Sequence, residues 1–453
     1  MSASHVFPRR SDSQLPTAVA GEGCWLIDSS GQRYLDASGG AAVSCLGHSA
    51  KPVLDAICQQ LQQLAYAHTS FFTTEPAEQL ADLLIQHAPG NLDRVYFVSG
   101  GSEAMEASLK LCRQFFLEIN QPQRSHVIAR RQSYHGNTLG ALSAGGNQWR
   151  RQPFEPLLSS GVSHIAPCYH YRDAEPGESL EEYGLRVANE LEAEILRIGP
   201  ERVAAFLAEP VVGATLGAVA PVPGYFQRIR EICDQYGVLL VLDEVMCGMG
   251  RTGSLFACEQ EGIAPDVLCI AKGLGAGLQP IGAMLCTGTI YQAIAEGSGF
   301  FQHGHTYQGH PTACAAGIAV LQTMLEQNLP EQVKEKGSCL RQALQQQFAE
   351  HPNVGDVRGE GMLAAVEFVA DRDTMAPLPP EMDAYARLVE LAYERGLIIY
   401  SRRTRGGTAG DHFLIAPPLI ITAEQIAEIM AILREALDAF AQQTGLPVQE
   451  EAA

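Results

Sequence analysis

Two charged residues, Asp243 and Lys272, stand at the ends of short apolar runs. Asp243 follows the run Val238–Leu242, and Lys272 comes just past the run Val267–Ile270. Both runs are typical of buried parallel strands. In an open α/β sheet the carboxyl ends of such strands line the ligand crevice. A lysine there can form a Schiff base with an aldehyde, and an aspartate commonly pairs with the ring nitrogen of pyridoxal phosphate. The pair therefore indicates a pyridoxal phosphate site.

Each of these residues also has an ordinary interpretation. An aspartate at a strand end can cap a helix or form a salt bridge, and a lysine can lie on the surface. However, Lys272 is preceded by Ile-Ala and followed by Gly-Leu-Gly-Ala-Gly, which is typical of a tight interior turn. A lysine seldom occupies such a turn without a partner or a covalent role. The two residues together favour the cofactor site.

A candidate phosphate site follows the run Val95–Val98. The next residues, Ser99–Glu103, contain Gly101 and Ser102 and open a predicted helix. Glycine lets the backbone approach an anion, and the free N–H groups of a helix start favour phosphate. A plain strand-to-helix turn with a serine cap is the alternative. The segment is neither a dinucleotide fingerprint nor a P-loop.

Two further strand ends carry candidate residues. Tyr134 and His135 follow the run His126–Ala129, and a tyrosine ring there could stack on a flat cofactor. Tyr134 could equally be an aromatic residue of the core. Glu209 follows the run Val203–Leu207 and either orients groups near the cofactor or caps a loop.

The segment Phe301–Pro311 contains three histidines. A metal site is not expected, because His303 and His305 have no carboxylate near them in sequence and no regular element that would frame them. The hydroxyl of Thr306 is better suited to a phosphate contact.

The composition excludes several kinds of partner. The chain of 453 residues has a formal net charge of −20, which argues against nucleic acid and anionic membranes as partners. Its twelve cysteines are scattered singly, as expected for small buried side chains in a reducing compartment. The amino-terminal segment has no apolar export signal, and no run is long enough to span a membrane. We therefore expect a cytoplasmic protein.

The order of elements predicts an α/β fold with a large and a small domain. Strands and helices alternate over more than two hundred residues, as in a mostly parallel, doubly wound sheet. The last predicted strand of this part is Ile281–Leu285. The expected domains are an N-terminal segment (1–60) that packs with the small domain, a large cofactor-binding domain (61–320) and a small α+β domain (321–453). The small domain is expected to contain helices at Leu321–Glu326, 337–349, Ala384–Arg395 and Glu424–Phe440, a strand at Met362–Phe368 and a mobile tail from Gln442.

Taken together, the motifs SGGSEAMEASLKL, SYHGNT, AEPVVGA, VLDEVMCGMGRTG, IAKGLGAG and HGHTYQGHP resemble the class III aminotransferases, which are fold type I pyridoxal phosphate enzymes. The resemblance covers nearly the whole chain. It implies that Lys272 forms the Schiff base and that Asp243 pairs with the pyridine nitrogen. It also implies that Tyr134 and Val245 contact opposite faces of the ring. The cofactor-binding residues expected from all these observations are Gly101, Ser102, Tyr134, His135, Glu209, Asp243, Val245, Lys272 and Thr306.

The same resemblance implies a homodimer, because in this family the threonine matching Thr306 reaches the phosphate of the neighbouring subunit. It also implies that Phe71 and Phe72 line the substrate pocket. The loop 401–407 matches the place of a mobile arginine that binds the substrate carboxylate, a task suited to the planar guanidinium group. Its three candidates are Arg402, Arg403 and Arg405, and the sequence does not distinguish them.

The resulting hypothesis is a ping-pong aminotransferase that takes an amino group from an amine or an ω- or α-amino acid and passes it to a keto acid such as pyruvate. The string after Glu209 looks more like the branch acting on ω-amino acids and amines than like the ornithine and γ-aminobutyrate branch. Racemases, an aminomutase and a decarboxylase share the same lysine and aspartate, so they remain alternatives. A non-catalytic protein that keeps the fold is a more distant one.

Overall fold

The structure, a computed structural model, describes residues 5–9, 11, 15–348, 350–404 and 409–446. Its largest sheet has seven strands in the order β4-β10-β9-β8-β7-β5-β6. β10 runs antiparallel to both β4 and β9, while β5 to β9 are mutually parallel, so the predicted mostly parallel sheet is confirmed. The strands are β4 (Leu92–Val98), β5 (His126–Arg130), β6 (Val162–Ile165), β7 (Val203–Ala208), β8 (Leu239–Asp243), β9 (Val267–Ile270) and β10 (Gly282–Thr287).

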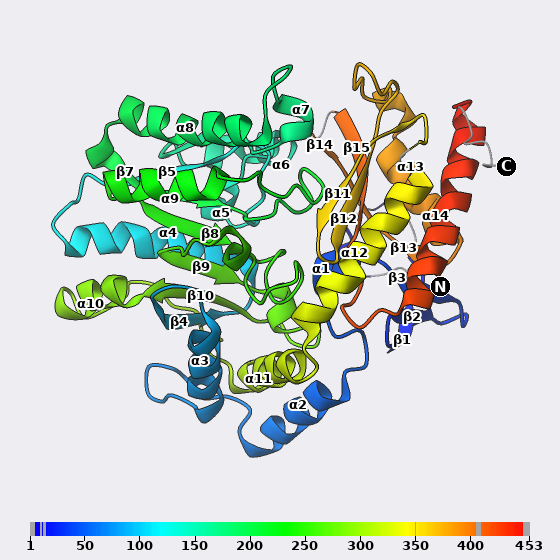
Figure 1. Cartoon of the computed structure of the whole chain (residues 1–453). Coiled ribbons are helices and arrows are strands. Elements are labelled where there is room, and N and C mark those ends of the chain that lie inside the picture. Colours follow the sequence, from blue (N-terminus) through cyan, green and yellow to red (C-terminus); the bar gives the residue numbers. More distant parts are fainter. Residues whose placement is uncertain (1–4, 10, 12–14, 349, 405–408, 447–453) are drawn as a thin grey trace.

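The central strands read as continuous apolar runs because both faces of the sheet are covered. Successive side chains of a strand point to opposite faces. In β8, Leu240 and Leu242 join the core formed with α8 (Leu180–Ile198) and α9 (Tyr225–Tyr236). Val241 between them joins the core formed with α4 (Gly101–Glu118). Figure 1 shows α4 on one side of this sheet and α8 with α9 on the other.

Helix α8 illustrates how the sequence sets a helix start. Ser179 Oγ accepts a hydrogen bond from the Glu182 N–H at 3.2 Å, and the Glu182 carboxylate accepts one from the Ser179 N–H at 2.9 Å. This capping box satisfies two N–H groups that would otherwise lack an acceptor. The remaining helices of the first lobe and its lower edge are α2 (Lys51–Gln63), α3 (Glu75–His87), α5 (Leu139–Ala144), α6 (Gln148–Arg151), α7 (His170–Asp173), α10 (Gly288–Glu296) and α11 (Pro311–Glu326).

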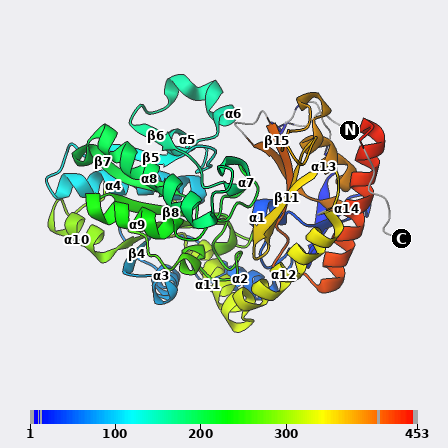
Figure 2. The same ribbon diagram turned by 45° about the horizontal axis from the view of Figure 1, so that its top comes forward.

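A second lobe lies beside the first in both views (Figures 1 and 2). It contains an antiparallel sheet of order β11-β12-β15-β14. A further sheet of order β1-β2-β3-β13 joins the first three strands of the chain to the C-terminal part, since β13 pairs in parallel with β3. The elements are α1 (Gly39–Ala42), α12 (Leu329–Phe348), α13 (Ala384–Glu394), α14 (Ala423–Thr444), β1 (Ala18–Glu22), β2 (Trp25–Asp28), β3 (Arg33–Asp36), β11 (Val354–Glu360), β12 (Leu363–Phe368), β13 (Leu397–Ile398), β14 (Tyr400–Thr404) and β15 (Ala409–Ile415).

Several element predictions for the C-terminal part were too short. Helix α11 begins at Pro311 and α12 at Leu329, both well before the predicted starts, and β11 was missed. Helix α14 continues past the predicted start of a mobile tail at Gln442 and ends at Thr444, whose Oγ1 donates to the Phe440 carbonyl at 2.7 Å. Residues 447–453 lie outside the described part. The domain boundaries at residues 60 and 320 stay a prediction.

In the described residues, no helix has both the length and the apolar character needed to cross a membrane.

Candidate active site

The two charged residues that the sequence singled out lie at neighbouring strand ends. Asp243 is the last residue of β8 and only 4% exposed, and β9 ends at Ile270, two residues before Lys272. Lys272 has φ of 42°, in the left-handed region that a lysine rarely adopts. Its carbonyl accepts hydrogen bonds from the N–H groups of Gly275 and Ala276, at 3.1 and 3.0 Å. The turn thus holds the lysine at the carboxyl edge of the sheet.

The surroundings of Lys272 favour its neutral amine. Burial lowers the pKa of Lys272 from its ordinary value, and the nearby guanidinium of Arg251 adds to this effect. The carboxylates of Asp243 and Glu209 act in the opposite direction without cancelling it. A buried lysine with a lowered pKa is a better nucleophile and a better proton acceptor than a surface lysine.

Both carboxylate oxygens of Asp243 have a donor. His135 Nδ1 lies 2.7 Å from Oδ2, and the Val245 N–H donates to Oδ1 at 3.0 Å. Because a carboxylate can only accept, His135 carries its proton on Nδ1. The other ring nitrogen of His135, Nε2, is buried and has no hydrogen-bond partner among the described residues. The aspartate is therefore held in one orientation at the strand end.

The predicted phosphate turn packs directly against two other site segments. A methyl group on Gly101 would lie 2.7 Å from Val245 Cγ1, and one on Gly136 would lie 2.6 Å from Ser102 Oγ. Ser102 Oγ also accepts a hydrogen bond from the Asn137 N–H at 3.1 Å. Helix α4 begins at Gly101, so the first N–H groups of an eighteen-residue helix point toward this turn. The geometry suits an anion such as a phosphate.

Glu209 orients the segment that carries Tyr134. Its Oε1 accepts from the Tyr134 N–H and its Oε2 from the Gly213 N–H, both at 2.8 Å. Burial raises the pKa of Glu209, opposed by these two donors and by His135. The Arg150 guanidinium lies 4.7 Å from the centre of the Tyr134 ring. These contacts fit both interpretations, since Glu209 accepts from the segment that carries Tyr134 and from the loop at Gly213.

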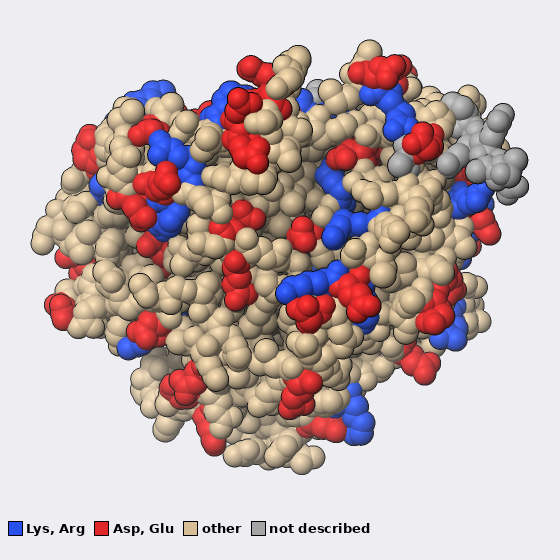
Figure 3. Space-filling view, viewed as in Figure 1, with Lys and Arg blue, Asp and Glu red and all other residues tan. Residues whose placement is uncertain are grey.

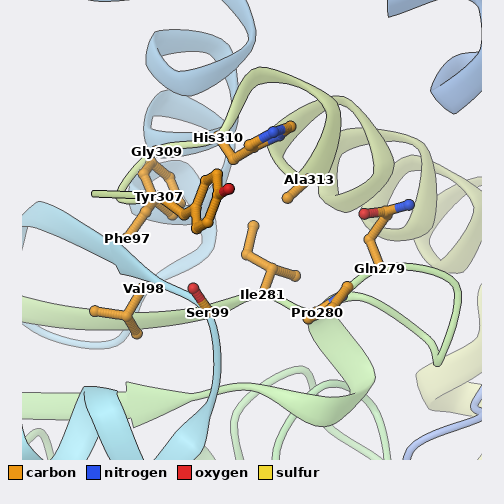
Figure 4. Close-up of a pocket in the computed structure, with 10 residues that line it drawn as sticks. All are labelled: Phe97, Val98, Ser99, Gln279, Pro280, Ile281, Tyr307, Gly309, His310 and Ala313. Atoms are coloured by element: carbon orange, nitrogen blue, oxygen red, sulfur yellow. The ribbon is translucent and has the colours of Figure 1, made fainter. Parts of the chain in front are cut away.

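Three predicted site residues lie on the surface of this chain. Phe71 and Phe72 are 79% and 67% exposed, and Thr306 is also exposed, with its carbonyl accepting from Tyr66 Oη at 2.7 Å. A pocket of about 440 Å³ lies beside the loop that carries Thr306 (Figure 4). Tyr307 and His310 border it on one side, and Ser99 of the phosphate turn borders it on the other. The loop and the phosphate turn are thus open to the same space.

The arginines of the predicted carboxylate loop differ in their partners. Arg403 forms ion pairs with Asp411 at 2.5 Å and with Asp383 at 3.5 Å. Arg402 donates to Tyr400 Oη at 2.6 Å, its guanidinium lies 4.3 Å from the centre of the Tyr400 ring, and its Nε has no hydrogen-bond partner among the described residues. Arg405 lies outside the described residues. Arg402 is therefore the better placed of the two described arginines to bind an added carboxylate.

Arg251, within the GRTG motif, was not among the residues predicted for the site. Its side chain is almost fully buried, and it donates to the carbonyls of Met362, at 3.2 Å, and Pro417. It thereby connects the turn after Asp243 to the end of the second lobe's sheet where β12 begins and β15 ends. The signal in the sequence is an arginine enclosed by glycines next to a predicted site strand.

Replacing Gly136 by alanine is expected to weaken pyridoxal phosphate binding about tenfold. Gly136 has φ of 131°, and the added methyl group would displace Ser102, a combined strain of about 1–3 kcal/mol. Fluorescence titration of the apoprotein measures the change in Kd. Gly177→Ala is the matched control, because its φ is 83° but no atom of the described residues lies within 4 Å of the added methyl group. Equal Kd values for the two variants would contradict the assignment of Ser99–Glu103 as the turn that binds the phosphate.

Comparisons with known proteins agree on one family. Residues 6–437 match the family model "Aminotransferase class-III". An uncharacterised aminotransferase of Schizosaccharomyces pombe is 46% identical over 439 residues, covering 96% of this chain and 95% of the relative. Gamma aminobutyrate transaminase 2 of Solanum lycopersicum is 36% identical, covering 92% of this chain and 90% of the relative. The omega transaminase from Pseudomonas jessenii in complex with PMP superposes with a TM-score of 0.92 at 33% identity, covering 98% of this chain and 97% of that structure.

Proposed function

Because the chain belongs to the class III aminotransferases, which use pyridoxal phosphate, we propose that Lys272 is its catalytic amine and that Asp243 faces the ring nitrogen of the cofactor. The protein is a pyridoxal-phosphate-dependent aminotransferase that moves an amino group from an amine or amino acid to a keto acid. The observation that carries the residue assignment is the position of Asp243 and Lys272 at neighbouring strand ends, with both oxygens of Asp243 engaged, one of them by His135.

The residues present fit the cofactor. Gly101 and Ser102 would hold its phosphate at the start of α4, Tyr134 and Val245 would contact the two faces of its ring, and Lys272 Nζ would hold its aldehyde carbon. When bound, pyridoxal phosphate supplies a ring that accepts electrons from the carbon attached to the amino group.

The protein groups handle the protons of the reaction. With the cofactor bound, Lys272 Nζ would accept the proton from the substrate carbon that bears the amino group and would return it to the carbon on the cofactor side of the same nitrogen. Burial favours this because it lowers the pKa of Lys272. The Asp243 carboxylate would face the ring nitrogen of the cofactor and would hold a proton there. His135 Nδ1 and the Val245 N–H fix the direction of that carboxylate.

We propose Arg402 as the group that binds the substrate carboxylate. Arg403 is engaged with Asp411, whereas the Arg402 contacts are to the Tyr400 hydroxyl and a backbone carbonyl, which a carboxylate can replace. A planar guanidinium binds a carboxylate through two parallel hydrogen bonds.

Arg402→Ala is expected to raise KM for pyruvate roughly tenfold to a hundredfold, since a charge-assisted hydrogen bond contributes about 1.5–3 kcal/mol. The KM for a primary amine without a carboxylate should stay within about twofold. Arg403→Ala is the matched control. It should destabilise the protein by about 3 kcal/mol, because it leaves Asp411 buried and unpaired. It should not change the ratio of the KM for pyruvate to the KM for an amine without a carboxylate. Steady-state kinetics and urea denaturation measure the two effects.

For the substrates, we propose a primary amine or ω-amino acid as donor and pyruvate as acceptor. The string that follows Glu209 supports this branch of the family, and so do similar structures described as omega transaminases. A donor screen with pyruvate and 2-oxoglutarate tests it. Turnover that needs no keto acid would favour the racemase, aminomutase or decarboxylase alternatives instead.

We also propose that the active enzyme is a homodimer in which Thr306 binds the phosphate in the neighbouring subunit. The exposed aromatic residues Phe71, Phe72 and Tyr307 near this loop support an interface there. Light scattering gives the mass. Mixing an inactive Lys272→Ala subunit with an inactive Thr306→Ala subunit should restore activity, since one of the two sites in the mixed dimer is intact.

A cytoplasmic location is supported by the twelve cysteines, all of which are free thiols.

A further inference from the structure

Three residues in the second lobe form a row across neighbouring strands. Glu367 of β12 lies opposite His412 of β15, and His412 lies opposite Arg402 of β14. Directly opposed residues of adjacent strands point to the same face of a sheet. Glu367 and His412 are both fully buried, so this row is an interior feature.

The first lobe packs against the Glu367 end of this row. Arg172, which follows the first lobe's Tyr169, forms an ion pair with Glu367 at 2.5 Å, and the Tyr169 hydroxyl donates to the same carboxylate. Arg358 of β11 pairs with the other Glu367 oxygen at 2.8 Å and donates to the carbonyls of Leu216 and Gly217. Figure 3 shows Lys and Arg side chains gathered at the boundary between the lobes on this face. The two lobes are thus joined by buried charged groups.

His412 contacts the same first-lobe loop, residues 211–219. Its Nε2 lies 3.1 Å from the Ala214 carbonyl and its Nδ1 lies 3.4 Å from the Gly410 carbonyl, and the shorter contact assigns the proton of a neutral ring to Nε2. A methyl group on Gly217, whose φ is 78°, would lie 2.5 Å from His412 Cδ2, so the loop encloses the ring without spare room. The groups facing this imidazole are Arg358 and Glu367, and burial lowers the pKa of His412 to about 4. His412 is therefore a neutral donor at neutral pH.

The other side of this loop belongs to the cofactor site. The Gly213 N–H, next to Ala214, donates to Glu209 Oε2, and Glu209 Oε1 accepts from the Tyr134 N–H. A continuous series of hydrogen bonds thus leads from Tyr134 through Glu209 and the loop to His412. His412 in turn lies directly opposite Arg402 on the neighbouring strand.

We propose that His412 is a positioning residue for the substrate carboxylate: by donating to Ala214, it fixes β14 and β15, and with them Arg402, relative to Tyr134. This rests on the proposed role of Arg402. A histidine suits the position because it supplies a donor without adding a charge between Arg358 and Arg402.

His412→Leu is expected to weaken carboxylate binding about tenfold, since one buried hydrogen bond is lost and the Ala214 carbonyl is left without its donor. KM for pyruvate should rise by this factor, while kcat and the KM for an amine without a carboxylate stay within about threefold. On the holoenzyme, calorimetry with propionate, an unreactive carboxylate, should show the same loss in Kd. His412→Gln, which keeps a donor at the position of Nε2, should restore most of the binding.

The controls separate this inference from the function on which it rests. His351→Leu replaces another buried histidine of the same lobe, outside the row, and should not change propionate binding. If Arg402→Ala weakens propionate binding and His412→Leu does not, the inference about His412 is wrong. If Arg402→Ala itself has no effect, the proposed function of Arg402 is wrong. If His412→Leu does not fold, Gly217→Ala serves in its place, because its methyl group displaces the His412 ring.

Discussion

Lys272→Ala is expected to lower the rate of amino-group transfer by about 10³-fold or more, because proton transfer by a positioned side chain contributes about 10²–10⁴-fold and this variant also loses the covalent attachment. The half-reaction with an amine donor, followed by absorbance in single turnover, measures the rate. Reduction of the holoenzyme with borohydride followed by peptide mapping should place the cofactor label on Lys272 in the wild type. No labelled peptide should be found in the variant.

Lys51→Ala is the control for this experiment, because the Lys51 side chain is 79% exposed and pairs with Asp55 on the same helix. Its rate and label should match those of the wild type. A label on any lysine other than Lys272, or a wild-type rate in Lys272→Ala, would overturn the assignment of the catalytic amine.

Asp243→Asn is expected to lower the same rate by about 100-fold. The substitution removes the negative charge beside the ring nitrogen, and a hydrogen bond to a charged group contributes about 1.5–3 kcal/mol. An amide has a single acceptor oxygen, so whichever way it turns, either His135 Nδ1 or the Val245 N–H loses its acceptor. The variant should therefore also be less stable than the wild type in urea denaturation.

Asp266→Asn separates the loss of stability from the loss of catalysis. Asp266 precedes β9, the neighbour of the strand that carries Asp243, at the opposite edge of the sheet, where it accepts from the Leu240 N–H and pairs with Arg230. This variant should lose stability but keep its rate of transfer in the folded protein. A rate for Asp243→Asn equal to that of Asp266→Asn would refute a role for the Asp243 charge.

The strands that carry the site were predictable because the chain buries them on both faces. β9 coincides with the predicted run, and β8 is displaced by one residue. Such strands read as uninterrupted apolar runs, and the polar residue that ends each run marks the site edge. The sequence therefore predicted the positions of Asp243 and Lys272 through local patterns alone.

The second lobe was harder to predict because its interior contains charge. Strand β11 has the sequence VGDVRGE, and its Arg358 is nearly buried in an ion pair with Glu367, so the strand lacks an apolar pattern.

The first half of α11, in the first lobe, was missed for another reason. It consists mainly of small residues that pack closely on α2 and α3, and a methyl group on Gly317 would lie 2.8 Å from Leu80. Close packing of this kind leaves little amphipathic periodicity.

The choice between the arginines could not be made from the sequence. It depends on Asp411, which faces Arg403 across two antiparallel strands, and the register of those strands is not written in local residue patterns. The same holds for His412, whose partners are brought to it by a loop about two hundred positions earlier in the chain.

The pairing of β3 with β13 has a consequence for synthesis of the chain. Leu35 and Asp36 find their strand partners in Leu397 and Ile398. The first hairpin therefore leaves the ribosome with an open edge that stays without this neighbour until most of the polypeptide has been translated. Since exposed strand edges promote association between nascent chains, the enzyme is expected to need protection by chaperones during this interval.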